Sequence, residues 1–346
     1  MVERRGIQLS RTIFSQKRQR LRTRRILIVC VVIALLLALI GGSIALVQKL
    51  VNRPAADDPS TAPDTPSAGQ TDDTPTIEPV RELPADFITR NTKAPRIVLY
   101  DVSAQALMYS KNGDEPCAPA SLTKLMTAIV ALENANLDDV ITAGNELYLL
   151  DPESSRAGIY LGNQMTLRQA LQGLLLKSGN DAAYVIAAQI GQKIDPNVTG
   201  QAAIDLFCQK MTERAAELGC TNTTFLNPDG IDKKGHHTTA NDLLKISLHA
   251  LKQPFIAETV ATEKVTTTLV SGQTKTWQNS NKLLAGGAYA YNGACGMKTG
   301  TTGEAGNCLI SCATRDGRTV LCILLGAEKD SLRYTETVEL LNLGFF

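Results

Sequence analysis

An uncharged, apolar stretch of 22 residues occupies positions 26–47 and limits what this chain can be. As a helix rising 1.5 Å per residue it would be about 33 Å long, enough to cross the hydrocarbon core of a bilayer. It exceeds the roughly 7–15 apolar residues of a cleaved signal peptide, and no clear cleavage site follows it. No second run of this length appears, which disfavours a multi-pass channel. The sequence therefore predicts a single transmembrane helix at 26–47 that is not cleaved.

Charge is divided unevenly about this stretch. Residues 1–25 have a net charge of +8 and the rest of the chain has −7, although the formal total is only +1. By the positive-inside rule, residues 1–25 are predicted to be a cytoplasmic tail and everything after the span to be extracytoplasmic. The basic block adjoins the span and has no interleaved aromatic platform for bases, so we interpret it as a topology signal and expect no nucleic-acid partner.

A proline-rich segment follows the span at 48–86. Seven of the chain's 14 prolines lie between positions 54 and 84, among Asp, Thr, Ser and Ala. Such a composition cannot bury enough apolar surface to form a core, so we predict a disordered linker that holds the next domain away from the membrane. The remaining residues, 87–346, are numerous enough for a folded domain with one sizeable core or two smaller ones.

Within residues 87–346, strand patterns lie near both ends and helical patterns lie in the middle. Strands are expected at 96–101, 107–111, 264–270, 274–278, 306–314 and 319–326. Helices are expected at 122–133, 167–176, 181–190, 202–218, 241–251 and 331–343. This order predicts an α+β fold with an antiparallel sheet built from both chain ends around a helical middle.

The Asp-Gly sequence at 316–317 predicts a type I′ turn between the last two strands. The register that follows from this turn places Cys312 and Cys322 on opposite faces of the sheet. Cys308 shares a face with Cys312, but a separation of about 13 Å along the strand is too great for a disulfide. All three are therefore expected to be packed free thiols.

Three short polar motifs are candidates for chemistry. In the first, Ser121 and Lys124 are three residues apart, so that a helix would place hydroxyl and amine on one face. A lysine with a lowered pKa can take the proton of a serine nucleophile. The alternative interpretation is an ordinary N-cap serine beside a solvated lysine.

The second motif, at 177–181, reads Lys-Ser-Gly-Asn-Asp and lies between two apolar helical segments. Its Ser178-Gly179-Asn180 set can project a hydroxyl and an amide into a cleft. Plain helix capping is the alternative. The third motif, at 296–301, reads Gly-Met-Lys-Thr-Gly-Thr. It offers a cation, hydroxyl groups and a glycine that lets a strand edge approach a substrate, whereas the alternative is an edge strand with a protective lysine.

Together the motifs resemble those of the penicillin-recognising serine enzymes. Their order is S-x-x-K, S-x-N and K-T-G, with 57 residues from Ser121 to Ser178 and 120 from Ser178 to Lys298. The stretches APASLTKLMTA, LLLKSGNDAA, FLNPDGIDKKGHHTTANDL and GMKTGTTGEAG are similar to low-molecular-weight penicillin-binding proteins of the D-alanyl-D-alanine carboxypeptidase family. The resemblance covers residues 97–346 and implies a β-lactamase/transpeptidase-like fold.

This resemblance implies a role for each motif residue. Ser121 would be the acylated nucleophile, Lys124 its general base and Ser178 a proton relay. The residues that would bind the substrate are Asn180, Lys298, Thr299, Gly300, Thr301 and Arg333. Lys298 would also hold Lys124 unprotonated, and the N–H groups of Ser121 and Thr301 would form the oxyanion hole. For Arg333, a surface arginine that opens the last helix is the alternative.

The implied reaction is removal of the terminal D-alanine from peptidoglycan stem peptides through an acyl-enzyme on Ser121, without a cofactor. β-Lactam antibiotics would be covalent inhibitors at the same serine. The three histidines show no metal-binding motif, so no metal ligand is assigned. The implied location is a bacterial cell membrane, single-pass, with the catalytic domain outside.

Three alternative functions stay open. A DD-endopeptidase that cleaves peptidoglycan cross-links shares every motif. A β-lactamase is disfavoured because its second motif is usually Ser-Asp-Asn and no convincing glutamate motif follows here. A non-catalytic wall-binding protein is disfavoured by the intact Ser121, Lys124 and Lys298.

Two features depart from the family pattern. Many members continue into a small β domain with a C-terminal amphipathic anchor, and here the span at 26–47 is expected to take the place of that anchor. In addition, Cys117 and Cys295 closely precede two of the catalytic motifs. We hypothesise that these two cysteines lie near each other and pair under oxidation.

Overall fold

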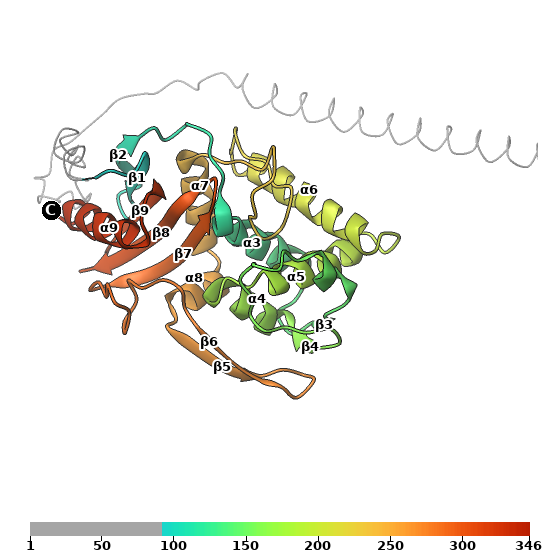
Figure 1. Cartoon of the computed structure of the whole chain (residues 1–346). Coiled ribbons are helices and arrows are strands. Elements are labelled where there is room, and N and C mark those ends of the chain that lie inside the picture. Colours follow the sequence, from blue (N-terminus) through green and yellow to red (C-terminus); the bar gives the residue numbers. More distant parts are fainter. Residues whose placement is uncertain (1–91) are drawn as a thin grey trace, which may run out of the picture. The chain divides into compact units, whose positions relative to one another are not determined.

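The computed structural model describes residues 92–346 (Figure 1). The predicted tail at 1–25, span at 26–47 and linker at 48–86 lie outside the described residues, as does the expected domain start at 87. Among residues 92–346, no helix combines the length and the apolar character that crossing a bilayer requires.

An antiparallel sheet of five strands joins the two ends of the described chain. The strands are β1 (Arg96–Asp101), β2 (Ala106–Lys111), β7 (Ala294–Thr302), β8 (Gly306–Arg315) and β9 (Arg318–Ala327), in the order β2-β1-β9-β8-β7. β1, from the start of the described chain, pairs with β9, from near its end. The predicted α+β fold, with a sheet built from both ends around a helical middle, is therefore confirmed.

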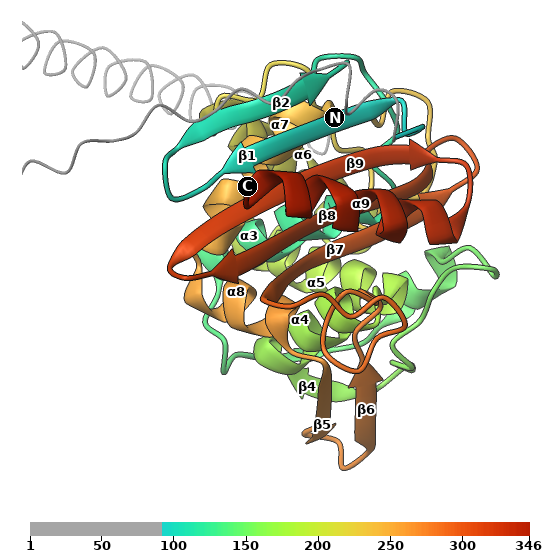
Figure 2. The ribbon, with the colours of Figure 1, turned by 90° about the vertical axis from the view of Figure 1, so that its left-hand side faces the viewer.

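Helices cover both faces of this sheet. Figure 2 looks onto it with α9 (Asp330–Gly344) in front and the other helices behind. Alternate apolar residues of β8 and β9 point to opposite faces of the sheet. Ile310 and Ile323 pack into the helical body. Leu309 and Leu324 pack with α9. Both strands are apolar over most of their length because neither face meets solvent.

The helical body lies between β2 and β7 in the chain. Its helices are α3 (Lys124–Asn134), α4 (Leu167–Leu176), α5 (Asn180–Ile194), α6 (Gln201–Glu217), α7 (Ala240–Leu251) and α8 (Pro254–Ala261). α4 has the predicted bounds because a capping box marks its start, in which Thr166 and Gln169 exchange side-chain to backbone hydrogen bonds. α8 was not predicted, since eight residues are too few to show a helical period.

Short elements complete the described chain, and most of them were not predicted. They are the 3-10 turns η1 (Ala120–Thr123) and η2 (Asn145–Leu149) and the pairs β3 (Val140–Thr142) with β4 (Gln164–Thr166) and β5 (Lys264–Thr268) with β6 (Thr274–Gln278). β5 and β6 were predicted as strands. They form a separate hairpin that projects away from the main sheet (Figure 1).

The turn between β8 and β9 has the predicted geometry. Asp316 and Gly317 both have positive φ, 49° and 78°, as a type I′ turn requires. Cys312 consequently faces Leu321 across the strands and packs into the helical body, whereas Cys322 packs on the α9 side. The predicted placement of these two cysteines on opposite faces is confirmed.

A glycine in the loop between α6 and α7 controls the position of η1. Gly230 has a φ of +91°, and a Cβ there would lie 1.8 Å from the carbonyl oxygen of Ala120. We expect Gly230→Ala to strain the backbone and to displace η1, which carries Ser121. The expected loss of unfolding free energy is about 2–4 kcal/mol, measured by urea denaturation.

Gly235→Ala is the matched control for this substitution. Gly235 has a similar φ of +93°, but its nearest neighbour is the flexible Leu226 side chain at 3.3 Å. The unfolding free energy of Gly235→Ala should therefore fall only by the cost of a positive φ at alanine, about 1 kcal/mol. Equal losses in the two variants would contradict the proposed overlap with Ala120.

Candidate active site

Ser121 and Lys124 meet where η1 passes into α3. The Nζ atom of Lys124 lies 2.7 Å from the Oγ atom of Ser121 and donates to the main-chain carbonyl of Asp229, also at 2.7 Å. The Ser121 hydroxyl is directed to the same carbonyl at 3.5 Å. Ser121 is not an N-cap, because α3 is capped at Thr123 and no side chain caps it. The capping interpretation of the first motif is therefore wrong.

Burial sets the proton affinity of Lys124. The side chain is 0% exposed, which excludes the solvated lysine considered above. Desolvation lowers the pKa of Lys124 to about 8, although the charges of Asp229 and Asp181 act to raise it. An amine with this pKa is partly neutral near neutral pH, so it can accept the proton of Ser121.

The edge strand β7 brings the third motif against Ser121. A Cβ at Gly300 would lie only 3.0 Å from the backbone nitrogen of Ser121. Glycine thus allows the strand to approach η1, as the motif predicted. The oxyanion hole formed by the N–H groups of Ser121 and Thr301 stays a prediction, and this close approach is the geometry it needs.

Lys298 is buried within β7 rather than protecting an exposed edge. It is 1% exposed, and its Nζ atom donates to the carbonyl of Thr299 at 3.1 Å. Burial lowers the pKa of Lys298 well below its ordinary value, and the charges of Lys124 and Arg333 lower it further. Repulsion between two ammonium groups is mutual, so a charge on Lys298 also disfavours a charge on Lys124.

Arg333 lies beneath the same strand. Its guanidinium donates to the carbonyl of Gly300 at 3.0 Å and to the Thr301 hydroxyl at 2.8 Å, and it pairs with Asp330. Only 8% of the residue is exposed, so the alternative of a surface arginine is wrong. Arg333 connects α9 to the motif strand. The Thr299 hydroxyl is held separately, by a 2.7 Å hydrogen bond with the Ser280 hydroxyl.

The second motif is linked to the first through the charge of Asp181, which acts on Lys124. Ser178 is buried with a φ of +59°, and Asn180 opens α5. The N-cap is Gly179, without a side-chain hydrogen bond, so the capping interpretation fails here also. Within residues 92–346 no hydrogen bond joins Ser178 or the Asn180 amide to Ser121 or Lys124. The neighbouring Asp181 is nonetheless close enough for its charge to act on Lys124.

Two aspartates with parts in this site were not identified from the sequence. Asp229 supplies the carbonyl that Lys124 and Ser121 share, and backbone acceptors leave no mark in a residue pattern. Asp181 accepts hydrogen bonds from the N–H groups of Ala157 and Ile159, which anchors that loop beside α5. Both aspartates belong to the stretches quoted above for the family resemblance, which was the available signal.

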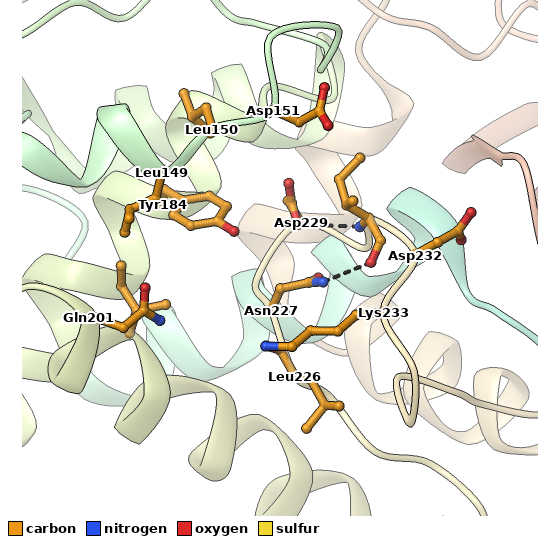
Figure 3. A pocket seen from close by; sticks show the side chains of 12 residues that line it. Leu149, Leu150, Asp151, Tyr184, Gln201, Leu226, Asn227, Asp229, Asp232 and Lys233 are labelled. Atoms are coloured by element: carbon orange, nitrogen blue, oxygen red, sulfur yellow. Dashed lines mark hydrogen bonds between the residues drawn. The ribbon is translucent and has the colours of Figure 1, made fainter.

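A pocket of about 380 Å³ is lined in part by Asp229, whose carbonyl contacts Ser121 and Lys124 (Figure 3). Its wall includes Asp151, Asp229, Asp232, Lys233 and Tyr184. Tyr184 lies on α5, one helical turn after Asn180. Its hydroxyl points toward Asp229 (Figure 3). Burial raises the pKa of Tyr184 and also that of the Asp229 carboxyl, so the tyrosine stays protonated and can donate.

The histidines have structural contacts. The ring of His236 hydrogen-bonds the Thr123 hydroxyl at 3.0 Å and accepts from the N–H of Leu226 at 2.9 Å. Burial lowers the pKa of His236 to about 4, so the ring is neutral at physiological pH. No group of three or more His, Cys, Asp or Glu side chains is arranged to hold a metal ion in the described part of the chain.

The expected proximity of Cys117 and Cys295 is wrong. The Sγ atom of Cys295 lies 2.6 Å from that of Cys312 instead. The backbone of Cys117 pairs with Thr238, and its thiol is close enough to Cys308 to raise the pKa of that group. All seven cysteines of residues 92–346 are free, as expected for Cys308, Cys312 and Cys322.

The geometry around Ser121, together with the topology of the sheet, identifies the kind of enzyme. A buried serine–lysine pair lies beside the edge strand of an α+β domain with the β-lactamase/transpeptidase-like fold, which is the arrangement of penicillin-recognising serine enzymes. Residues 84–329 match the family model described as D-alanyl-D-alanine carboxypeptidase. The chain belongs to this family of serine peptidases.

Individual relatives agree with this assignment. A D-alanyl-D-alanine carboxypeptidase of Streptomyces is 35% identical over 247 residues, 69% of this chain and 82% of that protein. DacF of Bacillus subtilis, also a D-alanyl-D-alanine carboxypeptidase, is 30% identical over 258 residues, 73% of this chain and 62% of the relative's length.

Solved structures show the same fold. The crystal structure of a Streptomyces DD-transpeptidase has a TM-score of 0.68 and 34% identity, covering 73% of this chain and 97% of that one. Penicillin-binding protein D2 from Listeria monocytogenes, in its ampicillin-bound form, has a TM-score of 0.60 and 28% identity, covering 74% and 98%.

The rate of Ser121 acylation should follow the neutral fraction of Lys124. With a pKa of about 8, this fraction rises with pH, so acylation by a fluorescent penicillin should increase with a midpoint near that value. Asp229→Asn removes a negative charge that favours the ammonium form. We expect its midpoint to lie at lower pH by about 0.5–1 unit in stopped-flow measurements.

Asp151→Asn is the control, because Asp151 lines the same pocket but is not among the groups that shift Lys124. Its profile should match that of the unchanged protein. A midpoint that stays in place or rises in Asp229→Asn would show that this carboxylate does not govern the proton on Lys124.

Proposed function

We propose that this protein is a serine-type D-Ala-D-Ala carboxypeptidase that removes the terminal D-alanine from peptidoglycan stem peptides. One observation carries the proposal: the buried Lys124 amine lies 2.7 Å from the Ser121 hydroxyl, next to the strand that contains Gly300. The family match and the names of the relatives support the same reaction.

Acylation follows from this pair. Neutral Lys124 takes the hydroxyl proton as the Ser121 oxygen attacks the carbonyl of the penultimate D-alanine. The N–H groups of Ser121 and Thr301 stabilise the oxyanion of the tetrahedral intermediate. The intermediate collapses to an ester on Ser121, and the departing amine of the terminal D-alanine receives a proton by way of Ser178.

The C-terminal carboxylate of the substrate favours the neutral form of Lys124. In this proposal it binds beside Lys298 and the Thr299 hydroxyl. Its negative charge stabilises the Lys298 ammonium, which in turn disfavours a proton on Lys124. Binding of a peptide with a free C-terminus thus favours the neutral amine that the reaction needs. Arg333 acts as a positioning residue, since it holds the backbone of Gly300 from behind.

Hydrolysis of the ester completes the reaction. Water attacks the acyl carbonyl, its proton goes to the Ser121 oxygen, and the shortened peptide leaves with a new carboxylate. β-Lactams would acylate the same serine, but their ring-opened amine stays attached to the acyl group and keeps water out. The ampicillin-bound form of the Listeria relative supports this partner class.

The catalytic domain is proposed to act outside a bacterial cell membrane, with the helix at 26–47 as its anchor and residues 1–25 in the cytoplasm. The uncharged span and the basic block before it support this arrangement. The linker at 48–86 would let the domain reach wall peptides away from the bilayer.

The activity is tested with full-length protein and a stem pentapeptide, by measuring released D-alanine. Ser121→Ala should lower the rate by at least about 10³-fold, because no nucleophile remains. Ser110→Ala, at an exposed position of β2, is the control and should retain activity. Release that survives Ser121→Ala would refute the assigned nucleophile.

The same assay separates the alternatives. Loss of a cross-linked peptide dimer without release of D-alanine from the pentapeptide would identify a DD-endopeptidase. Rapid turnover of a penicillin would identify a β-lactamase. Peptide binding without any cleavage would leave only a wall-binding role.

The membrane anchor is tested by fractionating bacteria that produce the chain. The full-length protein should stay in the membrane pellet after an alkaline carbonate wash, and external protease should reach its catalytic domain in spheroplasts. A chain that starts at residue 48 should appear in the soluble fraction. Extraction of the full-length protein by carbonate would rule out a spanning helix.

A further inference from the structure

A β-bulge in β7 places a second pair of reactive groups near the active site. Ala294 pairs with Ala313 and Gly296 with Cys312, so Cys295 is the extra residue between them. A bulge redirects side chains, and here it turns Cys295 toward β8. The two sulfur atoms of Cys295 and Cys312 lie 2.6 Å apart.

This contact distinguishes the pair from the other cysteines of residues 92–346. Cys220 and Cys308 direct their sulfurs to backbone carbonyls at 3.5 and 3.4 Å. Only Cys295 and Cys312 have a sulfur-to-sulfur hydrogen bond among the described cysteines. Their separation exceeds the length of a disulfide bond, about 2.0 Å, by only about 0.6 Å.

The backbone also permits a bond. Opposed residues of antiparallel strands have Cα atoms about 4.5–5.5 Å apart, within the range that disulfides span. Cys295 directly precedes Gly296, whose Cα is the partner of Cys312. Gly296 is held by a 2.9 Å hydrogen bond from the Ser311 hydroxyl to its carbonyl, so this end of the pair is already fixed.

We propose that Cys295 and Cys312 form an intrachain disulfide that clamps the start of the catalytic strand β7 to β8. The bond would lie three residues before Lys298 and would close the β7–β8 hairpin. It is a modification site independent of the reaction at Ser121. Under the proposed external location, disulfide-bonded compounds would be available as oxidants.

The bond between Cys295 and Cys312 would form by thiol–disulfide exchange, which needs another disulfide, R–S–S–R, as co-reactant. The thiolate of Cys295, which is half-buried while Cys312 is fully buried, attacks one sulfur of R–S–S–R and releases R–S⁻. Cys312 then gives up its proton and attacks the Cys295 sulfur, which forms the cross-link and releases the second R–S⁻. The two protons pass to the two released thiolates, so two cysteine thiols are oxidised and one disulfide is reduced. The hydrogen bond with Cys312 lowers the pKa of Cys295, which suits it to the first attack.

The cross-link is tested on the full-length chain in oxidised and reduced glutathione buffers, by non-reducing digestion and mass spectrometry. After oxidation we expect a linked peptide pair containing Cys295 and Cys312, lighter by two hydrogen atoms than the two free peptides. Cys295→Ser and Cys312→Ser should each abolish it. Cys308→Ser, which alters another buried cysteine of β8, should retain it.

Thermal unfolding gives a second measurement. The bond would close the loop from Cys295 to Cys312. This should raise the melting temperature of the oxidised protein by about 5–10 °C over the reduced protein. The rise should persist in Cys308→Ser and vanish in Cys295→Ser. Free Cys295 and Cys312 thiols after oxidation, a link to another cysteine, or a cross-link without a change in melting temperature would each overturn the proposed clamp.

Discussion

The burial of one amine governs this site. Lys124 is removed from water by the helical body on one side and by β7 on the other, and a buried ammonium is costly. The protein accommodates it by lowering its pKa to about 8 and by surrounding the amine with the Ser121 hydroxyl and the Asp229 carbonyl. The features of the site described above, from the Gly230 loop to the close approach of Gly300, hold these neighbours in place.

Three cations converge although the chain outside residues 1–25 is acidic. Lys124, Lys298 and Arg333 come from α3, β7 and α9, and the charges of Lys124 and Arg333 add to the effect of burial in lowering the pKa of Lys298. Such an arrangement lowers stability unless an anion binds. It is suited to a peptide that ends in a carboxylate. The sheet from both chain ends makes this convergence feasible, because α9 packs on β8 and β9, and from there Arg333 reaches Gly300 of β7.

Much of the fold could be predicted from local patterns. Apolar periods located α4 and the central strands, and the Asp-Gly turn set the pairing of β8 with β9. The motif residues were predicted as candidates, and the meeting of Ser121 with Lys124 was expected from their spacing, but the Asp229 carbonyl that both contact was not. The roles of Asp229 and Asp181 could not be predicted, because a backbone carbonyl and a Coulomb interaction across the core have no signature in residue spacing. The partner of Cys295 was predicted wrongly, since a bulge shifts which side chains meet.

Local sequence alone accounts for the uneven distribution of charge, the order of the motifs, most helix and strand positions and the register of the last hairpin. These are properties of residues that are neighbours in the chain. The tertiary structure decided whether Ser121 is a cap or a partner of lysine, whether Lys298 and Arg333 are exposed, and which cysteine meets Cys295. Desolvation and contact at these positions depend on segments distant in sequence, so packing decides them.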